Sequence, residues 1–342
     1  MTVTIVDTVT IADTASARVV TVGGPGRWRM TVPRVVTRLP SEPGVYRFRD
    51  ERGRALYLGR ATDLRRRVAS YWGELADRRH LRRMMPQVHR VEAVSCDSVH
   101  EAAWLELNLL ERARPRWNRM VGGLEVPVWI RLETRSRVAS LAVVHSPESQ
   151  GDALVFGPYL GGGRARLTVS GLDRVVSLAY AGEGLGGFDR DMARVRGVRS
   201  GELRSRVETV AAVLGRDPVA VAAVREHLVR RRDQAAARLA FELAGRIQEE
   251  LDAVAWVTSE QKVTVPEAVD VDVHGWADGV LVRFEIRGGR LCAWRQRVCR
   301  AEAAEPLVAA TPGTWARFAR RNAELAGRLY PPGDRAPEGP VT

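Results

Sequence analysis

Residues 43–67, PGVYRFRDERGRALYLGRATDLRRR, predict two strands and a helix in immediate succession. The segments GVYRFR and RALYLGR flank DERG, a polar turn that ends in glycine, and this pattern is typical of a β-hairpin. In the following segment, DLRRRVASYW, Leu64, Val68 and Tyr71 or Trp72 recur at helical spacing. This spacing predicts a helix with one apolar side.

The hairpin turn decides how two tyrosines of this stretch face each other. If DERG closes the hairpin symmetrically, Tyr46 lies opposite Tyr57 on one face of the sheet. A bulge at Gly53 would instead shift this register by one residue.

The rest of the chain alternates between strand-like and helix-like segments, so the predicted fold class is α/β (α+β). Residues 156–166, FGPYLGGGRAR, are expected to form a glycine-rich loop, and residues 181–200 an irregular segment. Leu239, Leu243, Ile247 and Leu251 form an apolar stripe on a predicted helix. The expected regions are an N-terminal extension (1–37), a small antiparallel sheet flanked by helices (38–120), an α/β linker region (121–200), a helical region (201–262), a β-rich region (263–330) and a disordered tail (331–342).

The composition points to a polyanionic partner. The net charge is +12, and 52 of the 53 basic residues are arginines because Lys262 is the sole lysine. Such a surplus favours DNA, RNA or an anionic membrane face as partner, although an arginine-rich solvated surface is the alternative.

No apolar run approaches the roughly 18 residues of a membrane span, no signal-peptide pattern opens the chain, and three cysteines make no disulfide framework. We therefore expect a cytoplasmic protein.

Glu106 is a carboxylate inside an apolar stripe. Ser98 and Glu101 form a capping-box pattern that predicts a helix starting there and ending before Pro115. A desolvated carboxylate needs a partner. Glu106 is therefore either buried in an ion pair with a neighbouring arginine or a ligand for a divalent cation. The stripe that contains it comprises Val99, Ala102, Ala103, Leu110 and Ala113.

The hairpin, its helix and Glu106 together suit phosphodiester hydrolysis. On the helix behind the hairpin, Arg67 flanks the apolar side, whereas Arg65 and Arg66 point outward. A metal on Glu106 would offset charge on phosphate oxygens, an arginine would stabilise the transition state, and a phenol would order or deprotonate water. Taken singly, each tyrosine is equally explained by packing, so the combination carries the hypothesis.

These residues resemble the signature of the GIY-YIG nucleases, which is present as residues 44–46 (GVY) and 57–59 (YLG). The segments LPSEPGVY, YLGRATDLRRRVASY and EAAWLELNLLERARPRWN are similar to the N-terminal nuclease domain of the excinuclease subunit UvrC, over about residues 39–118. The resemblance implies a GIY-YIG domain built on a small antiparallel sheet, and double-stranded, damaged DNA as its substrate.

The resemblance also implies a role for individual residues. Glu106 takes the position of the family's ligand for a divalent cation, Mg²⁺ or Mn²⁺. Arg60 departs from the family's usual lysine beside Tyr57, so it supplies charge but does not exchange a proton. The six catalytic positions are Tyr46, Tyr57, Arg60, Arg67, Tyr71 and Glu106. The four residues expected to contact DNA are Arg65, Arg66, Arg116 and Asn118, in a segment (38–119) with 18 arginines and 11 acidic residues.

Weaker resemblances to UvrC continue beyond the nuclease region. Residues 156–159 (FGPY) and the strands after residue 268 each match a UvrC segment, and LAFELAGRIQEEL (239–251) resembles its UvrB-binding helical hairpin. This hairpin implies UvrB as a partner, through Leu239, Phe241 and Glu242. The cysteine cluster of UvrC is absent from 181–200, so no iron–sulfur cluster is expected there.

The predicted function is a metal-dependent DNA endonuclease of nucleotide excision repair. The matching sequence ends where the RNase H-like and helix-hairpin-helix parts of UvrC would begin, so the resemblance implies one nuclease site, as in the UvrC-like nuclease Cho, and incision 3′ to a lesion. A catalytically weak accessory that binds DNA or UvrB is the alternative. A sequence-specific restriction or homing nuclease is a third class, which the matches beyond the nuclease region disfavour.

Overall fold

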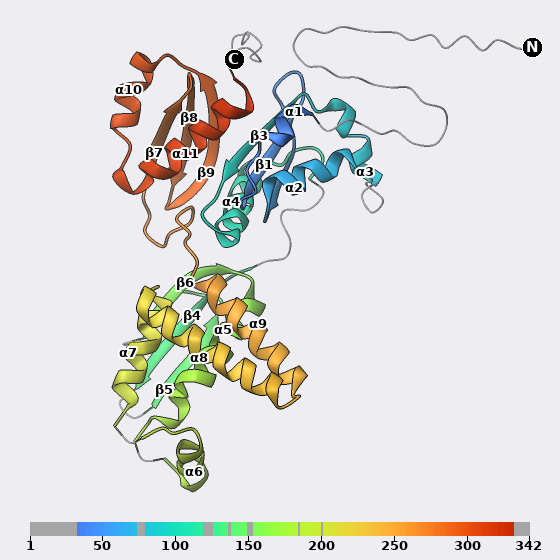
Figure 1. The fold of residues 1–342 in the computed structure, drawn as a ribbon. Coiled ribbons are helices and arrows are strands. Elements are labelled where there is room, and N and C mark those ends of the chain that lie inside the picture. The colour runs from blue at the N-terminus through green and yellow to red at the C-terminus, as the bar shows by residue number, and fades with distance from the viewer. Residues whose placement is uncertain are drawn as a thin grey trace, which may run out of the picture.

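The computed structural model describes residues 33–73, 79–118, 126–135, 138–148, 153–183, 185–199 and 201–331. Most of the expected N-terminal extension (1–37) and nearly all of the expected tail (331–342) lie outside these residues. The N-terminal and C-terminal parts lie side by side, and the middle of the chain forms a separate lobe (Figure 1). None of the helices in the described ranges has the length and apolar character that a bilayer span requires.

The N-terminal part is built on an antiparallel sheet of order β2-β1-β3, in which β1 and β2 form the predicted hairpin. One face packs against α2 and the 3₁₀ turn Ser70–Trp72, and the other face packs against α4. The elements are α1 (Arg34–Thr37), β1 (Gly44–Arg49), β2 (Ala55–Ala61), α2 (Leu64–Ala69), α3 (Arg79–Arg82), the 3₁₀ turn Met85–Gln87, β3 (Arg90–Ser95) and α4 (Val99–Arg112).

The register of the hairpin differs from the symmetric expectation. Tyr46 lies opposite Gly59, and Tyr57 lies opposite Phe48. The register shifts next to Phe48, where β2 carries one extra residue, Leu56, between two paired positions. The expected Tyr46–Tyr57 pairing is therefore wrong, although both rings remain on the same face.

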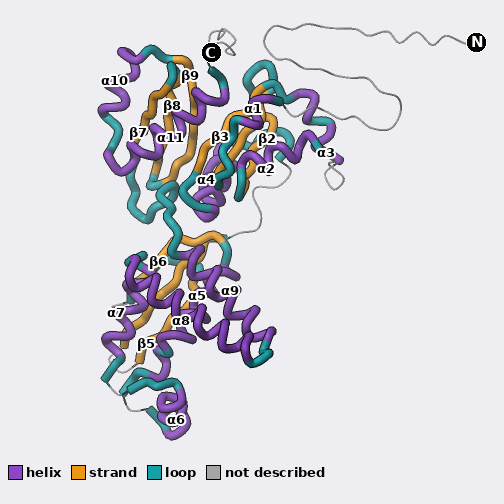
Figure 2. Tube along the Cα trace, in the orientation of Figure 1, coloured by secondary structure: helices purple, strands orange, loops and turns teal. Residues whose placement is uncertain are grey.

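The middle lobe joins the expected linker and helical regions around one hydrophobic core. Its sheet has the order β5-β4-β6. Residues 156–160 are strand rather than loop, so Gly161 alone connects β6 to α5, and part of 181–200 is helical (Figure 2). The elements are β4 (Pro127–Arg135), β5 (Val138–Val144), β6 (Leu154–Leu160), α5 (Gly162–Val176), the 3₁₀ turn Leu178–Tyr180, α6 (Gly187–Val195), α7 (Leu203–Leu214), α8 (Pro218–Ala237) and α9 (Phe241–Val257).

The C-terminal part is a sheet of order β7-β8-β9 with two helices. The strands of the expected β-rich region are present, and the two helices that follow them were not predicted. The first helix contains Pro306 and packs on one side of the sheet, and the second buries Phe318 on the other. The elements are β7 (Val271–Ala277), β8 (Val280–Arg287), β9 (Arg290–Val298), α10 (Ala301–Ala309) and α11 (Gly313–Leu329).

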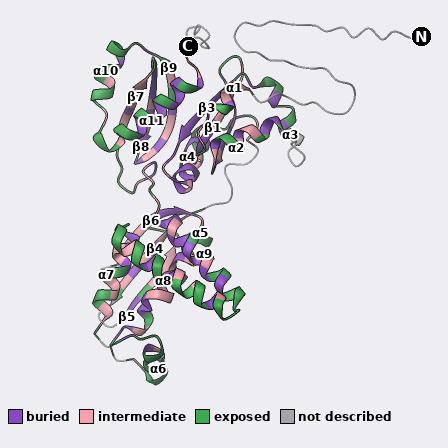
Figure 3. Cartoon of the chain, in the orientation of Figure 1, coloured by how far each residue is buried: buried purple, intermediate pink, exposed green. Residues whose placement is uncertain are grey.

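Helix α4 lies at the junction of all three parts, and most of it is buried (Figure 3). The Ser98 hydroxyl accepts a hydrogen bond from the Glu101 amide, as the capping box predicted. In a capping box the Glu101 carboxylate would accept from the backbone N–H of Ser98. Here it accepts from the backbone N–H groups of Asp97 and of Lys262, which lies in the segment that leads to the C-terminal sheet. Asn108 donates to the carbonyl of Val263 in the same segment.

His100 contacts the middle lobe from α4. Its ring is fully buried and lies 4.1 Å from the ring of Trp256 and 5.8 Å from that of Tyr159, measured between centroids. Its Nε2 accepts a hydrogen bond from the indole of Trp104. Burial, followed by the charges of Arg216 and Arg164, lowers the pKa of His100 to about 3, so the imidazole is neutral in the folded protein.

We predict that His100 makes the protein less stable at mildly acidic pH. In the unfolded chain it binds a proton near its ordinary pKa of 6.5, whereas in the folded chain it does so only near 3. Because the unfolded state binds more protons in this window, the free energy of unfolding falls as pH falls. Urea titrations of His100→Phe should show a flatter pH dependence between pH 6.5 and about pH 5, above the range of most carboxyl groups. Exposed His145→Asn is the control, and an unchanged slope in His100→Phe would contradict the assignment.

Candidate active site

Three tyrosines form one ring cluster on the α2 face of the N-terminal sheet. The centroid distances are 6.2 Å for Tyr46–Tyr57, 5.8 Å for Tyr46–Tyr71 and 6.0 Å for Tyr57–Tyr71. The hydroxyls of Tyr46 and Tyr71 are 2.6 Å apart and share a hydrogen bond. Tyr46 and Tyr71 are fully buried, whereas Tyr57 is only partly buried. Tyr57 is therefore the phenol through which this cluster meets solvent.

Gly59 is the residue that lets the cluster form. A Cβ at this position would lie 2.6 Å from the Tyr46 hydroxyl and 2.8 Å from a ring carbon of Tyr57. A glycine inside a strand commonly marks such a close approach. The glycine of the YLG segment thus has a steric cause, which the sequence shows only as a glycine between Leu58 and Arg60.

Arg67 extends from α2 toward the same cluster, as its place on the predicted helix indicated. Its guanidinium carbon lies 5.4 Å from the centroid of the Tyr71 ring. Burial alone would lower the pKa of Arg67. The neighbouring tyrosines together raise it by more, so the pKa of Arg67 lies above its ordinary value. The site therefore holds a fixed positive charge.

Glu106 approaches the edge strand β2 from α4, close enough to Tyr57 for its charge to add to the raised pKa of that phenol. Its side chain is 14% exposed, so it lies at the rim of the apolar stripe rather than inside it. One carboxylate oxygen accepts a hydrogen bond from the backbone N–H of Arg60 at 3.2 Å, and the other lies 3.4 Å from the Nε of the same residue. The helix places Ala113, expected on the same stripe, in the exposed C-cap.

Asn118 and Trp117 brace β2 from its outer edge. The amide of Asn118 accepts a hydrogen bond from the N–H of Leu58 at 2.9 Å and donates to its carbonyl at 2.7 Å. The backbone N–H of Trp117 donates to the carbonyl of Leu56. These contacts fix the strand segment that carries Tyr57 and Gly59, which is a structural task that the sequence did not reveal.

The other expected DNA contacts lie on the surface near the site. Arg65 and Arg66 are exposed on α2, and Arg116 is exposed beyond α4. The Nε of Arg65 donates to the carbonyl of Leu39 at 2.7 Å, which anchors the side chain at its base. The guanidinium of Arg116 lies over the Trp117 ring at 5.7 Å.

Tyr46 and Tyr57 are protonated phenols in this structure. Burial, followed by the charges of the neighbouring tyrosines, raises the pKa of Tyr46 well above its ordinary value. Burial is also the largest cause of the raised pKa of Tyr57, to which Tyr71 and Glu106 add. Without a further positive charge, Tyr57 is thus a hydrogen-bond donor to an oxygen ligand rather than a base.

Glu106 fits a metal that keeps most of its water ligands. Among the described residues, no group of three or more His, Cys, Asp or Glu side chains is arranged to hold an ion. Mg²⁺ is nevertheless commonly bound through one or two carboxylates, with water completing its octahedron. A single carboxylate at the rim of the cluster suits this mode of binding.

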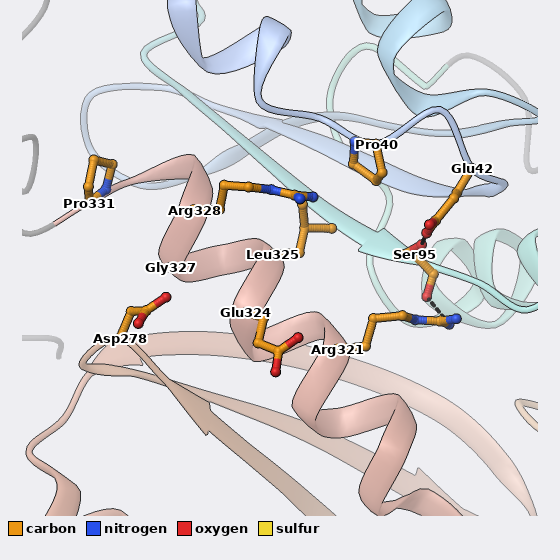
Figure 4. A pocket seen from close by; sticks show the side chains of 10 residues that line it. All are labelled: Pro40, Glu42, Ser95, Asp278, Arg321, Glu324, Leu325, Gly327, Arg328 and Pro331. Carbon is orange, nitrogen blue, oxygen red and sulfur yellow. Dashed lines mark hydrogen bonds between the residues drawn. The ribbon is translucent and has the colours of Figure 1, made fainter.

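A cavity of about 660 Å³ lies away from this site, between α11 and the N-terminal part (Figure 4). Glu42 contacts the hydroxyl of Ser95 there, and Arg321 donates to the Ser95 carbonyl at 2.9 Å. None of the six expected catalytic residues lines this cavity.

The tip of the α8–α9 hairpin exposes large apolar side chains. The exposed fractions are 74% for Leu239, 66% for Phe241 and 44% for Leu243. Leu239 lies before α9 with a φ of 59°, so of the predicted stripe only Ile247 and Leu251 enter the core. The expected partner residues thus form an exposed tip, with Glu242 also exposed.

A family model for the UvrC-like GIY-YIG domain matches residues 42–119. Residues 42–119 form a UvrC-like GIY-YIG domain. The match confirms the resemblance seen in the sequence and covers all six expected catalytic positions of this domain.

Curated relatives extend the similarity beyond the GIY-YIG domain. UvrABC system protein C of Syntrophotalea carbinolica is 30% identical over 251 residues, which are 70% of this chain and 40% of that protein. The protein of the same name from Mycolicibacterium paratuberculosis is 31% identical over 273 residues, 74% of this chain and 41% of that protein. The protein of the same name from Gemmatimonas aurantiaca is 29% identical over 323 residues, which are 89% of this chain and 52% of that protein. The chain thus spans about half of these relatives or less.

Solved structures of one related domain also match. The GIY-YIG N-terminal endonuclease domain of UvrC from Thermotoga maritima, bound to its catalytic divalent cation magnesium, is 31% identical, and the match covers 24% of this chain and 90% of that domain with a TM-score of 0.23. A point mutant of that domain, in which one tyrosine is replaced by phenylalanine, gives 30% identity with the same coverage and TM-score.

We predict that Gly59→Ala destabilises the GIY-YIG domain by about 1–3 kcal/mol, the usual cost of overpacking. The added Cβ would displace the Tyr46 hydroxyl, which a β2 backbone braced by Asn118 does not accommodate. Urea denaturation of the full chain measures the loss. Gly73→Ala is the control, because a Cβ there would lie 3.7 Å from the Ser70 carbonyl, an ordinary contact. Equal stabilities of the two variants would show that Gly59 has no steric role.

Proposed function

We propose that this protein is a divalent-metal-dependent DNA endonuclease that makes the 3′-side incision of nucleotide excision repair. The observation that carries the proposal is that Arg67 and the partly exposed Tyr57 share one tyrosine cluster, while Glu106 contacts Arg60 on the same strand as Tyr57. Its similarity to UvrABC system protein C over more than the nuclease domain supports a repair role rather than restriction.

Each residue has a task that follows from its position. Glu106 would hold Mg²⁺ or Mn²⁺, which would supply charge neutralisation at the scissile phosphate. The Arg67 guanidinium is fixed against the phenols and would stabilise negative charge on the phosphate oxygens. Tyr57 would donate to or orient the attacking water, while Tyr46 and Tyr71 hold its ring in place. Arg65, Arg66 and Arg116 would contact the DNA backbone.

The accessory alternative is favoured by one observation. Arg60 lies against the carboxylate of Glu106, so the metal ligand of this chain already has a counter-ion. A protein held in this state would bind DNA or UvrB without cutting. The nuclease proposal requires that a cation displaces this contact.

We predict that Glu106→Gln abolishes nicking of a lesion-bearing duplex in the presence of UvrB and Mg²⁺, with a rate at least about 100-fold below wild type. Glutamine keeps the size of the side chain but removes the negative charge that a cation needs. Glu51→Gln, in the exposed hairpin turn, is the matched control and should cut normally. Denaturing gels report both the rate and the side of incision.

Two outcomes of that assay would overturn parts of the proposal. Equal nicking by wild type and Glu106→Gln would show that the site is assigned to the wrong residue. An inert wild type on every lesion and every divalent cation tried would favour the accessory function.

The exposed hairpin tip supports UvrB as partner. An apolar tip on a helical hairpin is suited to helix-on-helix docking, since its side chains have no partner within the described part of this chain.

We predict that Phe241→Asp weakens UvrB binding by about 30-fold or more, the effect of losing a central aromatic anchor. Biolayer interferometry with immobilised UvrB measures the affinity. Phe188→Asp, which changes another exposed phenylalanine on α6, is the matched control and should bind as wild type does. If both variants bind UvrB as tightly as wild type, the hairpin tip is not the docking site.

A further inference from the structure

Arg60 engages both oxygens of the proposed metal ligand. Its backbone N–H donates to one oxygen of Glu106, and its Nε lies 3.4 Å from the other. The backbone contact is set by β2 and α4, so it persists whatever the side chain does. The guanidinium contact is a separate, reversible ion pair between side chains that are 36% and 14% exposed.

A divalent cation and this guanidinium compete for the same carboxylate oxygen. A bound Mg²⁺ would lie roughly 2.1 Å from its oxygen ligand, which would place two positive centres side by side in a partly buried rim. Two such charges repel strongly where solvent is partly excluded. Cation binding at Glu106 therefore requires the Arg60 side chain to leave.

The displaced Arg60 side chain would have a new binding partner in the proposed reaction. Arg60 is partly exposed at the solvent edge of β2, so it is able to turn outward without uncovering the core. Guanidinium groups bind phosphate oxygens through two parallel hydrogen bonds. A DNA phosphate bound by that cation would lie near Glu106, the residue that the Arg60 side chain already contacts.

From this geometry, and resting on the proposed function, we infer that Arg60 is a charge latch. It neutralises Glu106 in the metal-free protein and transfers to a DNA phosphate when the cation binds. Cation and DNA binding then strengthen each other, because each relieves a cost that the other would meet alone. An arginine in place of the family's usual lysine is thus a device that couples the two ligands.

Equilibrium binding tests the latch without measuring cleavage. Calorimetric titration with Ca²⁺ alone, in the absence of DNA, compares wild type, Arg60→Gln and Glu106→Gln. Removing the competing charge should tighten Ca²⁺ binding in Arg60→Gln by about 5-fold or more, whereas Glu106→Gln should lose it. Arg52→Gln, in the exposed hairpin turn, removes the same charge elsewhere and should match wild type.

The coupling itself is measured by fluorescence anisotropy of a labelled duplex with and without Ca²⁺, with gels to confirm that the duplex stays intact. Ca²⁺ should tighten DNA binding by wild type several-fold more than by Arg60→Gln. Glu106-dependent Ca²⁺ binding that Arg60→Gln leaves unchanged overturns the latch alone and leaves the nuclease proposal standing. Ca²⁺ binding that survives in Glu106→Gln overturns both.

Discussion

The burial of α4 on several sides is the constraint on which the rest of the structure depends. One side packs on the N-terminal sheet, another on the C-terminal sheet, and its N-terminal turn meets the aromatic side chains of the middle lobe. The junctions are specified by polar groups, because Glu101 and Asn108 each bind backbone atoms of the 262–263 segment. Buried polar groups need partners with defined geometry, so α4 holds the three parts in one arrangement.

The candidate site inherits its geometry from this arrangement. Glu106 comes from α4, the phenols come from β1, β2 and the turn after α2, and Arg67 comes from α2. These elements meet because β1 lies between β2 and β3 and buries side chains on both faces. None of the six residues expected at the candidate site lines the cavity beside α11, so that cavity is a separate feature of the structure.

The sequence predicts the type and place of several elements well. The hairpin and α2 follow from alternation and helical spacing. The register does not follow, since the bulge at Leu56 leaves no mark in composition. On α4, Glu101 and Asn108 occupy positions that a one-sided helical wheel assigns to solvent, yet both are buried. Leu239 and Leu243 show the opposite error, because the apolar stripe assigns them to the core and yet both are exposed. A stripe at helical spacing does not reveal where the helix leaves the core.

The two interpretations of Glu106 that the sequence leaves open describe one carboxylate with two possible counter-charges. A carboxylate that is 14% exposed needs a positive neighbour at all times, and a cation site that must bind and release its ion spends part of its cycle without one. Glu92, on the α4 face of the sheet, has permanent counter-charges, with Arg47 and Arg49 paired to it at 2.7 Å. The looser contact of Arg60 at 3.4 Å is what a site with an exchangeable counter-charge requires. Under the proposed charge latch, an ion pair and a metal site at Glu106 would be successive states rather than alternatives.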